Sequence, residues 1–293
     1  MSKVILVLID GCRPDAIEAA STPAIDRLIA SGASTMTART VEPPITLPAH
    51  FSLFTSLNPR DHNVTTNTGS PSPSSTACSI VETVKNHRLK AAAVYSWELL
   101  RNLAPPSALD ASVYLSTDKT SFTDLDIMEY AVRLVTRQLP DFCFIYLEGV
   151  DQAGHQDGWM SVSYLSAVEK ADAAIGMLMQ ALADFGLIDD YAIILQSDHG
   201  GIDHHHLEPE NDVLTIPWIV CAEGIRQGYT IQSTVSILDT APTIARLMGL
   251  PPHYSWKGRM PLEIVADASP DNMHRTWLVS GAANPHQGNE RRR

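Results

Sequence analysis

Short apolar runs alternate along the chain with longer segments that have helical spacing. The apolar runs, rich in Val, Ile and Leu, cover residues 4–9, 91–95, 142–147, 192–196 and 217–221. Runs of this length are typical of strands buried on both faces. The segments with helical periodicity cover 22–31, 76–86, 124–138, 161–185 and 239–248. This alternation predicts an α/β fold, a three-layer α/β/α sandwich in which helices cover both faces of a largely parallel sheet.

The chain shows no internal repeat and no linker that would divide it into two independent domains. Residues 1–293 are therefore predicted to form one domain, with room for a small cap or insertion at about 68–141. Within that stretch, 70–75 has the Pro and Ser content of a loop, and 103–123 is too irregular to assign.

Three of the predicted strands lead into an aspartate, namely Asp10, Asp151 and Asp198. In an open α/β sheet ligands bind at the carboxyl ends of the strands, so we expect the three carboxylates to converge on one crevice. Any one of them, taken alone, is better explained as a helix cap or turn residue. Three together, two of them with a histidine close by, favour a ligand site.

The spacing of histidines around two of these aspartates is typical of a metal centre. His155 follows Asp151 by four residues, and His199 is adjacent to Asp198. Carboxylate oxygen and neutral imidazole are ligands that zinc accepts readily, and the shortage of thiolates favours an open catalytic site. The segment Asp203-His204-His205-His206 follows. Each of its histidines alone is better explained as a surface residue, but one of them would complete a second ligand set.

A threonine lies between the first two predicted strands, in Pro43-Pro44-Ile45-Thr46-Leu47-Pro48-Ala49-His50. The hydroxyl of Thr46 just before a predicted helix would have amide donors and the helix dipole nearby, which suit a nucleophile and a phosphate anion. Taken alone, Thr46 is better explained as a helix cap. His50 has no matched partner in the sequence and is interpreted as a structural or surface residue.

Together these residues resemble the alkaline phosphatase superfamily, in particular its type I phosphodiesterase and nucleotide pyrophosphatase branch. The matching motifs, in the family's order, are Asp10-Gly11, Thr46-Leu47-Pro48-Ala49-His50 with 57–62, Val150-Asp151-Gln152-Ala153-Gly154-His155 and Ser197-Asp198-His199-Gly200. They span residues 10–206. The resemblance implies an alkaline-phosphatase-like fold with a minimal cap.

The resemblance also implies a site with two zinc ions, with manganese as an alternative. The implied ligands are Asp10, Asp198 and His199 for one ion and Asp151, His155 and one histidine of the 204–206 cluster for the other. Related short sequences favour His206 over His204 and His205. Thr46 would attack phosphorus and form a phosphothreonine that water hydrolyses, while Asn67 and Thr46 would bind the substrate phosphate.

The implied activity is hydrolysis of phosphate esters, of the phosphodiesterase, nucleotide pyrophosphatase or phosphatase type. A sulfatase would need a modifiable Cys or Ser and an Arg where this chain has Thr46 and His50. A related phosphomutase would have a larger cap and, among phosphoglycerate mutases, a Ser nucleophile. A non-catalytic metal-binding relative would have a broken ligand set. No Arg occupies a motif position typical of monoesterases, which slightly favours diesters.

Composition limits which partners and which cellular compartment are expected. The formal net charge of −12 argues against extended nucleic acid and leaves a small phosphate ester as the expected substrate. The four cysteines, at 12, 78, 143 and 221, form no C-x-x-C pair and are interpreted as free thiols. The N-terminal apolar run is short for a signal peptide, and no run has membrane-spanning length. A cytoplasmic protein without a membrane partner is expected; the sequence leaves the oligomeric state open.

Overall fold

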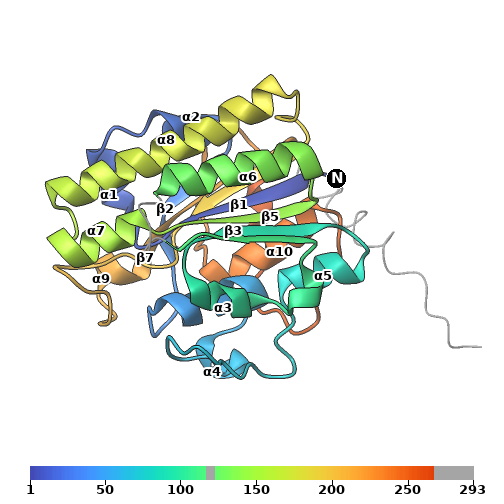
Figure 1. Ribbon diagram of the computed structural model, residues 1–293, viewed down its shortest axis with the longest axis horizontal. Helices are drawn as coiled ribbons and strands as arrows, with labels where there is room; N and C mark the ends of the chain where they lie inside the picture. Colours follow the sequence, from blue (N-terminus) through green and yellow to red (C-terminus); the bar gives the residue numbers. More distant parts are fainter. Residues whose placement is uncertain (117–122, 267–293) are drawn as a thin grey trace, which may run out of the picture.

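A computed structural model describes residues 1–116 and 123–266 and contains a mixed eight-stranded sheet (Figure 1). The strand order is β4-β3-β5-β1-β6-β7-β2-β8. The strands are β1 (Lys3–Ile9), β2 (Ala33–Arg39), β3 (Ala91–Tyr95), β4 (Ala111–Tyr114), β5 (Phe142–Leu147), β6 (Tyr191–Gln196), β7 (Thr215–Cys221) and β8 (Tyr229–Thr230). Part of the segment 103–123, which the sequence left unassigned, lies outside the described residues.

The direction of the strands divides the sheet in two. From β4 through β6 all neighbours are parallel, whereas β7 runs antiparallel to both β6 and β2. Between β6 and β7 the chain carries only the short helix α9 (Asn211–Leu214), which is no crossover helix of the kind that parallel strands require. The predicted α/β fold is confirmed, but the run at 217–221 belongs to an antiparallel strand.

Helices cover both faces of the sheet (Figure 1). On one face lie α1 (Pro14–Ala19), α2 (Pro23–Ser31), α6 (Asp124–Gln138), α7 (Gly149–Asp157) and α8 (Val162–Asp184). On the other lie α3 (Thr46–Thr55), α4 (Pro59–His62), α5 (Ile80–Asn86) and α10 (Thr240–Leu247). Four short 3-10 helices complete the described elements, namely η1 (Glu98–Leu103), η2 (Pro106–Ala108), η3 (Ile237–Asp239) and η4 (Leu262–Ile264). None of the helices within residues 1–116 and 123–266 is long and apolar enough to cross a bilayer.

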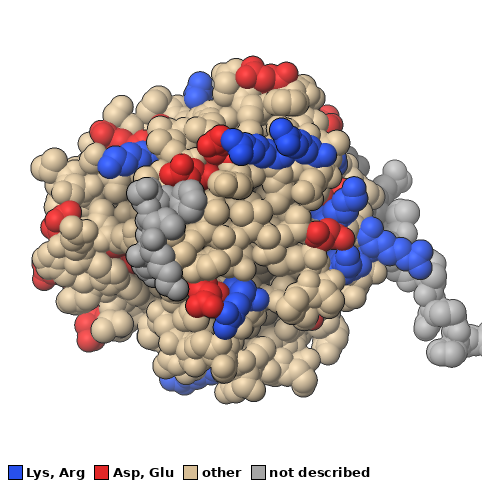
Figure 2. Space-filling view, in the orientation of Figure 1, with Lys and Arg blue, Asp and Glu red and all other residues tan. Residues whose placement is uncertain are grey.

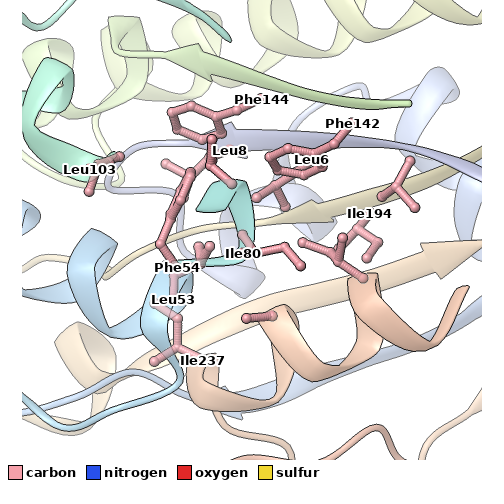
Figure 3. Close-up of a cluster of buried hydrophobic side chains, with 14 of the residues drawn as sticks. Leu6, Leu8, Leu53, Phe54, Ile80, Leu103, Phe142, Phe144, Ile194 and Ile237 are labelled. Carbon is pink, nitrogen blue, oxygen red and sulfur yellow. The ribbon is translucent and has the colours of Figure 1, made fainter. Parts of the chain in front are cut away.

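Strand β1 shows why its apolar run is continuous. Leu6 and Leu8 point into the core beneath α3, α5 and α10, which Figure 3 shows, whereas Ile5 and Val7 point into the core beneath α2, α6 and α8. Because successive side chains of a strand alternate between the two faces, a strand covered on both sides needs apolar residues at every position.

Two differences from the predicted elements have local causes. Helix α5 begins at Ile80 rather than at 76, because Ser79 and Glu82 form a capping box there. Residues 68–141, where the sequence left room for a small cap, instead supply β3 and β4 to the sheet and α5 and α6 to its two faces. In its described part this segment therefore belongs to the central fold.

Candidate active site and metal centre

The three aspartates meet at the carboxyl ends of neighbouring strands. Asp10 directly follows β1, and Asp198 follows β6 by two residues. The expectation for Asp151 needs a correction, since β5 ends at Leu147 and Asp151 lies in the first turn of helix α7. Asp151 and His155 are thus one helical turn apart on the same helix, a spacing that brings two side chains to one point.

The potential ligand atoms form two groups that share one residue. Asp151, His155 and His206 make one group, and Asp10, Asp151 and His199 make the other; within each, one ligand atom per residue lies within 4.8 Å of the others. Asp198 reaches the second group, because its Oδ2 lies 3.4 Å from His199 Nε2. Asp151 therefore lies between the two positions at which the sequence places an ion.

The carboxylates lack the partners that buried charges need. Asp10 Oδ1, Asp151 Oδ1 and Asp198 Oδ2 are buried without a hydrogen-bond partner among the described residues. Burial, followed by the charge of Asp198, raises the pKa of both Asp10 and Asp151 above the ordinary range. Such an arrangement is costly unless a cation lies among the oxygens, so the donor set fits divalent metal ions.

The histidines present the nitrogen that a metal would use. In His155, His199 and His206, Nδ1 donates to a backbone carbonyl, which leaves Nε2 as the acceptor. The carbonyls belong to His204 (2.9 Å), Gly200 (2.9 Å) and Pro44 (2.8 Å), respectively. Desolvation lowers the pKa of His199 and of His206 to about 3, so both rings are neutral, as metal ligation requires.

Only one histidine of the 204–206 cluster belongs to these groups. His206 is 6% exposed and stacks on His199 with ring centroids 3.7 Å apart. His204 is exposed, and its Nδ1 donates instead to the carbonyl of His155. His205 is half-buried and belongs to neither group. Of the three histidines, the structure thus brings only His206 together with Asp151 and His155, and its role as a metal ligand stays a prediction.

Thr46 is the first residue of α3, and it does not cap that helix. The N-cap is Ile45, which makes no side-chain capping hydrogen bond, so the cap interpretation of Thr46 is wrong. Its Oγ1 lies 3.3 Å from His199 Nε2, and the residue is 6% exposed. Asn67 lies beside it, since its Oδ1 accepts from the Leu47 amide at 2.9 Å, which leaves Nδ2 as the donor end of that side chain.

Two residues of the site were missed in the sequence. The hydroxyl of Tyr146, in β5, donates to Asp10 Oδ2. His50, interpreted as structural, is fully buried; its Nδ1 donates to the Thr46 carbonyl at 2.8 Å and lies 3.6 Å from Asp198 Oδ2. The four-residue spacing between Thr46 and His50 was the available signal for His50.

Several solved structures share this architecture. An inactive variant of murine ectonucleotide pyrophosphatase/phosphodiesterase 5, in complex with AMP, superimposes with a TM-score of 0.70 at 17% identity, over 86% of this chain and 96% of that one. The phosphonate monoester hydrolase of Agrobacterium radiobacter gives 0.71 at 16% identity, over 92% and 78% of the two chains. A 2-O GAG sulfatase gives 0.72 at 13% identity, over 88% and 73%. At these identities the likeness establishes the fold.

The family follows from the sequence match. Residues 4–224 match the model of the type I phosphodiesterase / nucleotide pyrophosphatase family, so the chain belongs to that family, and the predicted branch is confirmed. Member 3 of the rat ectonucleotide pyrophosphatase/phosphodiesterase family is 30% identical over 224 residues, which is 67% of this chain and 24% of that protein. Member 1 from mouse is 28% identical over 201 residues, 61% of this chain and 21% of that protein. The chain thus aligns with about a quarter or less of the length of these curated relatives.

Proposed function

We propose that this protein hydrolyses small phosphate esters, preferably diesters, in a metal-dependent reaction with Thr46 as the nucleophile. The observation that carries the proposal is the convergence on His199 Nε2. Thr46 Oγ1 and Asp10 Oδ1 each lie 3.3 Å from that nitrogen, and Asp198 Oδ2 lies 3.4 Å from it. The proposed nucleophile and the candidate metal ligands therefore lie together around one buried nitrogen atom.

The chain's own groups prepare Thr46 to attack and to hold a phosphate. Thr46 Oγ1 lies 3.3 Å from His199 Nε2, so the hydroxyl would lie beside any ion that this nitrogen holds. The first amides of α3 lie beside that hydroxyl, where the helix dipole favours an anion. Asn67 would bind a phosphate oxygen through Nδ2, because its Oδ1 is fixed by the Leu47 amide. These groups would stabilise charge on the transferring phosphoryl group.

We propose two zinc ions as the resident metals, with manganese as the alternative. Asp10, Asp198 and His199 would hold one, and Asp151, His155 and His206 the other. Bound ions would lower the pKa of the Thr46 hydroxyl and stabilise charge on the phosphate and the leaving oxygen. A phosphothreonine on Thr46 would then be the covalent intermediate, released by water.

Diesters fit the charge of the site better than monoesters. None of the charged groups that shift the pKa values of Asp10, Asp151, His199 and His206 is a Lys or Arg. Arg13, three residues after Asp10, is held by Asp15 and Asp212 and by the carbonyl of Gly201. Among the described residues, a dianionic monoester would therefore find no Lys or Arg that acts on these four groups, whereas a diester carries one negative charge less.

The surface favours a small substrate over a long polyanion. On the face drawn in Figure 2, Lys and Arg are interspersed with Asp and Glu, and the formal net charge is −12. Extended nucleic acid would meet net repulsion there. All four cysteines are unpaired, which supports a reducing compartment. A cytoplasmic location stays a prediction that cell fractionation would test.

The function is tested with bis-p-nitrophenyl phosphate, p-nitrophenyl phosphate and p-nitrophenyl sulfate, after chelation and after reloading with zinc or with manganese. We expect activity with zinc, in the order diester, monoester, sulfate. Thr46→Ala should keep its metal and lose turnover by on the order of 10³ or more, and Thr46→Ser should retain part of it. Acid quenching during turnover should trap phosphate on the peptide that contains Thr46.

Three outcomes would overturn parts of this proposal. Activity with manganese alone would favour a mutase-like relative. Full turnover of Thr46→Ala without a trapped adduct would mean that water attacks phosphorus directly. Absence of both metal and activity in the wild-type protein would leave the non-catalytic interpretation.

A further inference from the structure

Trp159 folds back over the candidate metal centre from the end of α7. Gly158, with φ of 92°, reverses the chain in a conformation that glycine adopts readily. The backbone N–H of Trp159 then donates to the Asp203 carbonyl at 2.7 Å, and its indole N–H donates to the Gly11 carbonyl at 2.8 Å. The residue is 7% exposed. Trp159 therefore connects residues 203–206, which carry the histidine cluster, to the segment that follows β1.

The indole ring lies directly on two further backbone segments. A Cβ atom added to Gly154 would lie 2.6 Å from the ring, and one added to Gly201 would lie 2.1 Å from it. No side chain fits at either position without a shift. Gly154 precedes His155 in α7, and Gly201 lies three residues after Asp198.

The ring also limits the orientation of two candidate ligands. The ring of His155 packs nearly perpendicular to it, with centroids 5.0 Å apart at 84°. The ring of His206 lies 6.0 Å away at 63°. Trp159 thus contacts every segment that carries a candidate ligand, namely 10–11, α7, 198–201 and 203–206.

We propose that Trp159 is a positioning residue that holds these four segments in register and so fixes the two metal positions relative to each other. This inference rests on the proposed two-metal centre. The segments come from distant parts of the chain, and the carboxylates they carry repel one another, so the ligands need support from outside the metal-binding set. Because Trp159 contacts segments of both ligand sets, its loss should weaken both ions.

The first test is Trp159→Phe, which keeps an aromatic ring but removes the indole N–H and part of the ring. Zinc binding is measured by competition with chelators of known affinity, a readout that does not depend on turnover. We expect both ions to bind about 10- to 100-fold more weakly, the range found when support of a metal ligand is removed. The melting temperature of the metal-free protein is measured in parallel.

Trp256→Phe is the matched control. Trp256 is 9% exposed, and its indole N–H also donates to a backbone carbonyl at 2.8 Å, that of Cys78. It lies in a segment that carries no candidate ligand. Both variants should lower the melting temperature of the metal-free protein, but Trp256→Phe should bind both ions as the wild-type protein does.

A double-mutant cycle separates positioning from ordinary packing. Gly154→Ala should weaken zinc binding roughly tenfold while Trp159 is present, but about twofold or less in a Trp159→Leu background, where the ring that meets the new methyl group is gone. Equal effects in the two backgrounds, or wild-type affinity in Trp159→Phe, would reduce Trp159 to core packing. Failure of the wild-type protein to bind zinc would instead overturn the proposed function, and this inference with it.

Discussion

Aspartates are buried in two regions of this molecule, and their hydrogen bonds differ. At helix N-termini, Asp124 accepts from the first amides of α7 at 3.1 and 3.2 Å, and Asp172 accepts from those of α2 at 2.8 and 3.0 Å. In the candidate metal centre, Asp10, Asp151 and Asp198 each keep one buried oxygen without a partner among the described residues. Burial of a carboxylate is thus common to both regions, and only the missing partner indicates a ligand site.

Asp151→Asn tests the distinction between the two groups of aspartates and is expected to have the largest effect. The substitution removes a ligand oxygen shared by both groups, so metal content should fall and turnover should drop by on the order of 10³. The metal-free protein should be at least as stable as wild type, because a charge that burial and Asp198 disfavour has gone. Metal analysis and thermal unfolding in chelator measure both. A metal-free variant clearly less stable than wild type would place Asp151 with the capping aspartates.

The next effect concerns the histidine cluster. His206→Ala should weaken metal binding by about 10- to 100-fold or more, because its Nε2 is held toward the site by the Nδ1 contact to Pro44. His204→Ala and His205→Ala are the matched controls and should change metal affinity by less than about threefold. Chelator competition on the three variants decides the matter. Equal losses in all three would mean that the loop, and not one ligand, binds the metal.

Asp172→Ala should lower stability and leave metal binding unchanged, the reverse of what is expected for Asp151→Asn. Removing the carboxylate leaves the amides of Ala24 and Ile25 without an acceptor, so the free energy of unfolding should fall by about 1–3 kcal/mol. Metal content and turnover, measured well below the melting temperature, should match wild type. Loss of metal at full stability would contradict the division of the aspartates into two groups.

The last expected effect is confined to a limited range of pH. Burial raises the pKa of Asp124 to about 6 from its ordinary 3.8. The stability that the neutral carboxyl contributes is therefore fully present below about pH 4 and is lost as pH rises through about 6. Asp124→Asn should remove this dependence, so its stability relative to wild type should rise by on the order of 1–3 kcal/mol between pH 4 and pH 7. Denaturant unfolding of the metal-free proteins across this range measures it, and parallel profiles would contradict the assignment.

The sequence predicted the elements whose signal is local. The runs at 4–9, 91–95 and 142–147 became β1, β3 and β5, because a strand covered on both faces must be apolar at every position. Strand β2 was missed, since its Ser and Thr residues break the apolar pattern, and it is a strand because β7 and β8 pair with it. The direction of β7 likewise follows from its connection and not from its composition.

For the candidate site, the sequence predicted the metal ligands and Thr46, because these residues occur in short motifs that resemble those of the family. Only the tertiary structure placed Asp151 between the two ligand groups and Trp159 over all four ligand-bearing segments. The contact of Trp159 with Gly11 spans 148 positions of the chain. Periodicity and spacing describe residues a few positions apart, whereas such contacts depend on how the strands and helices pack, which no local pattern encodes.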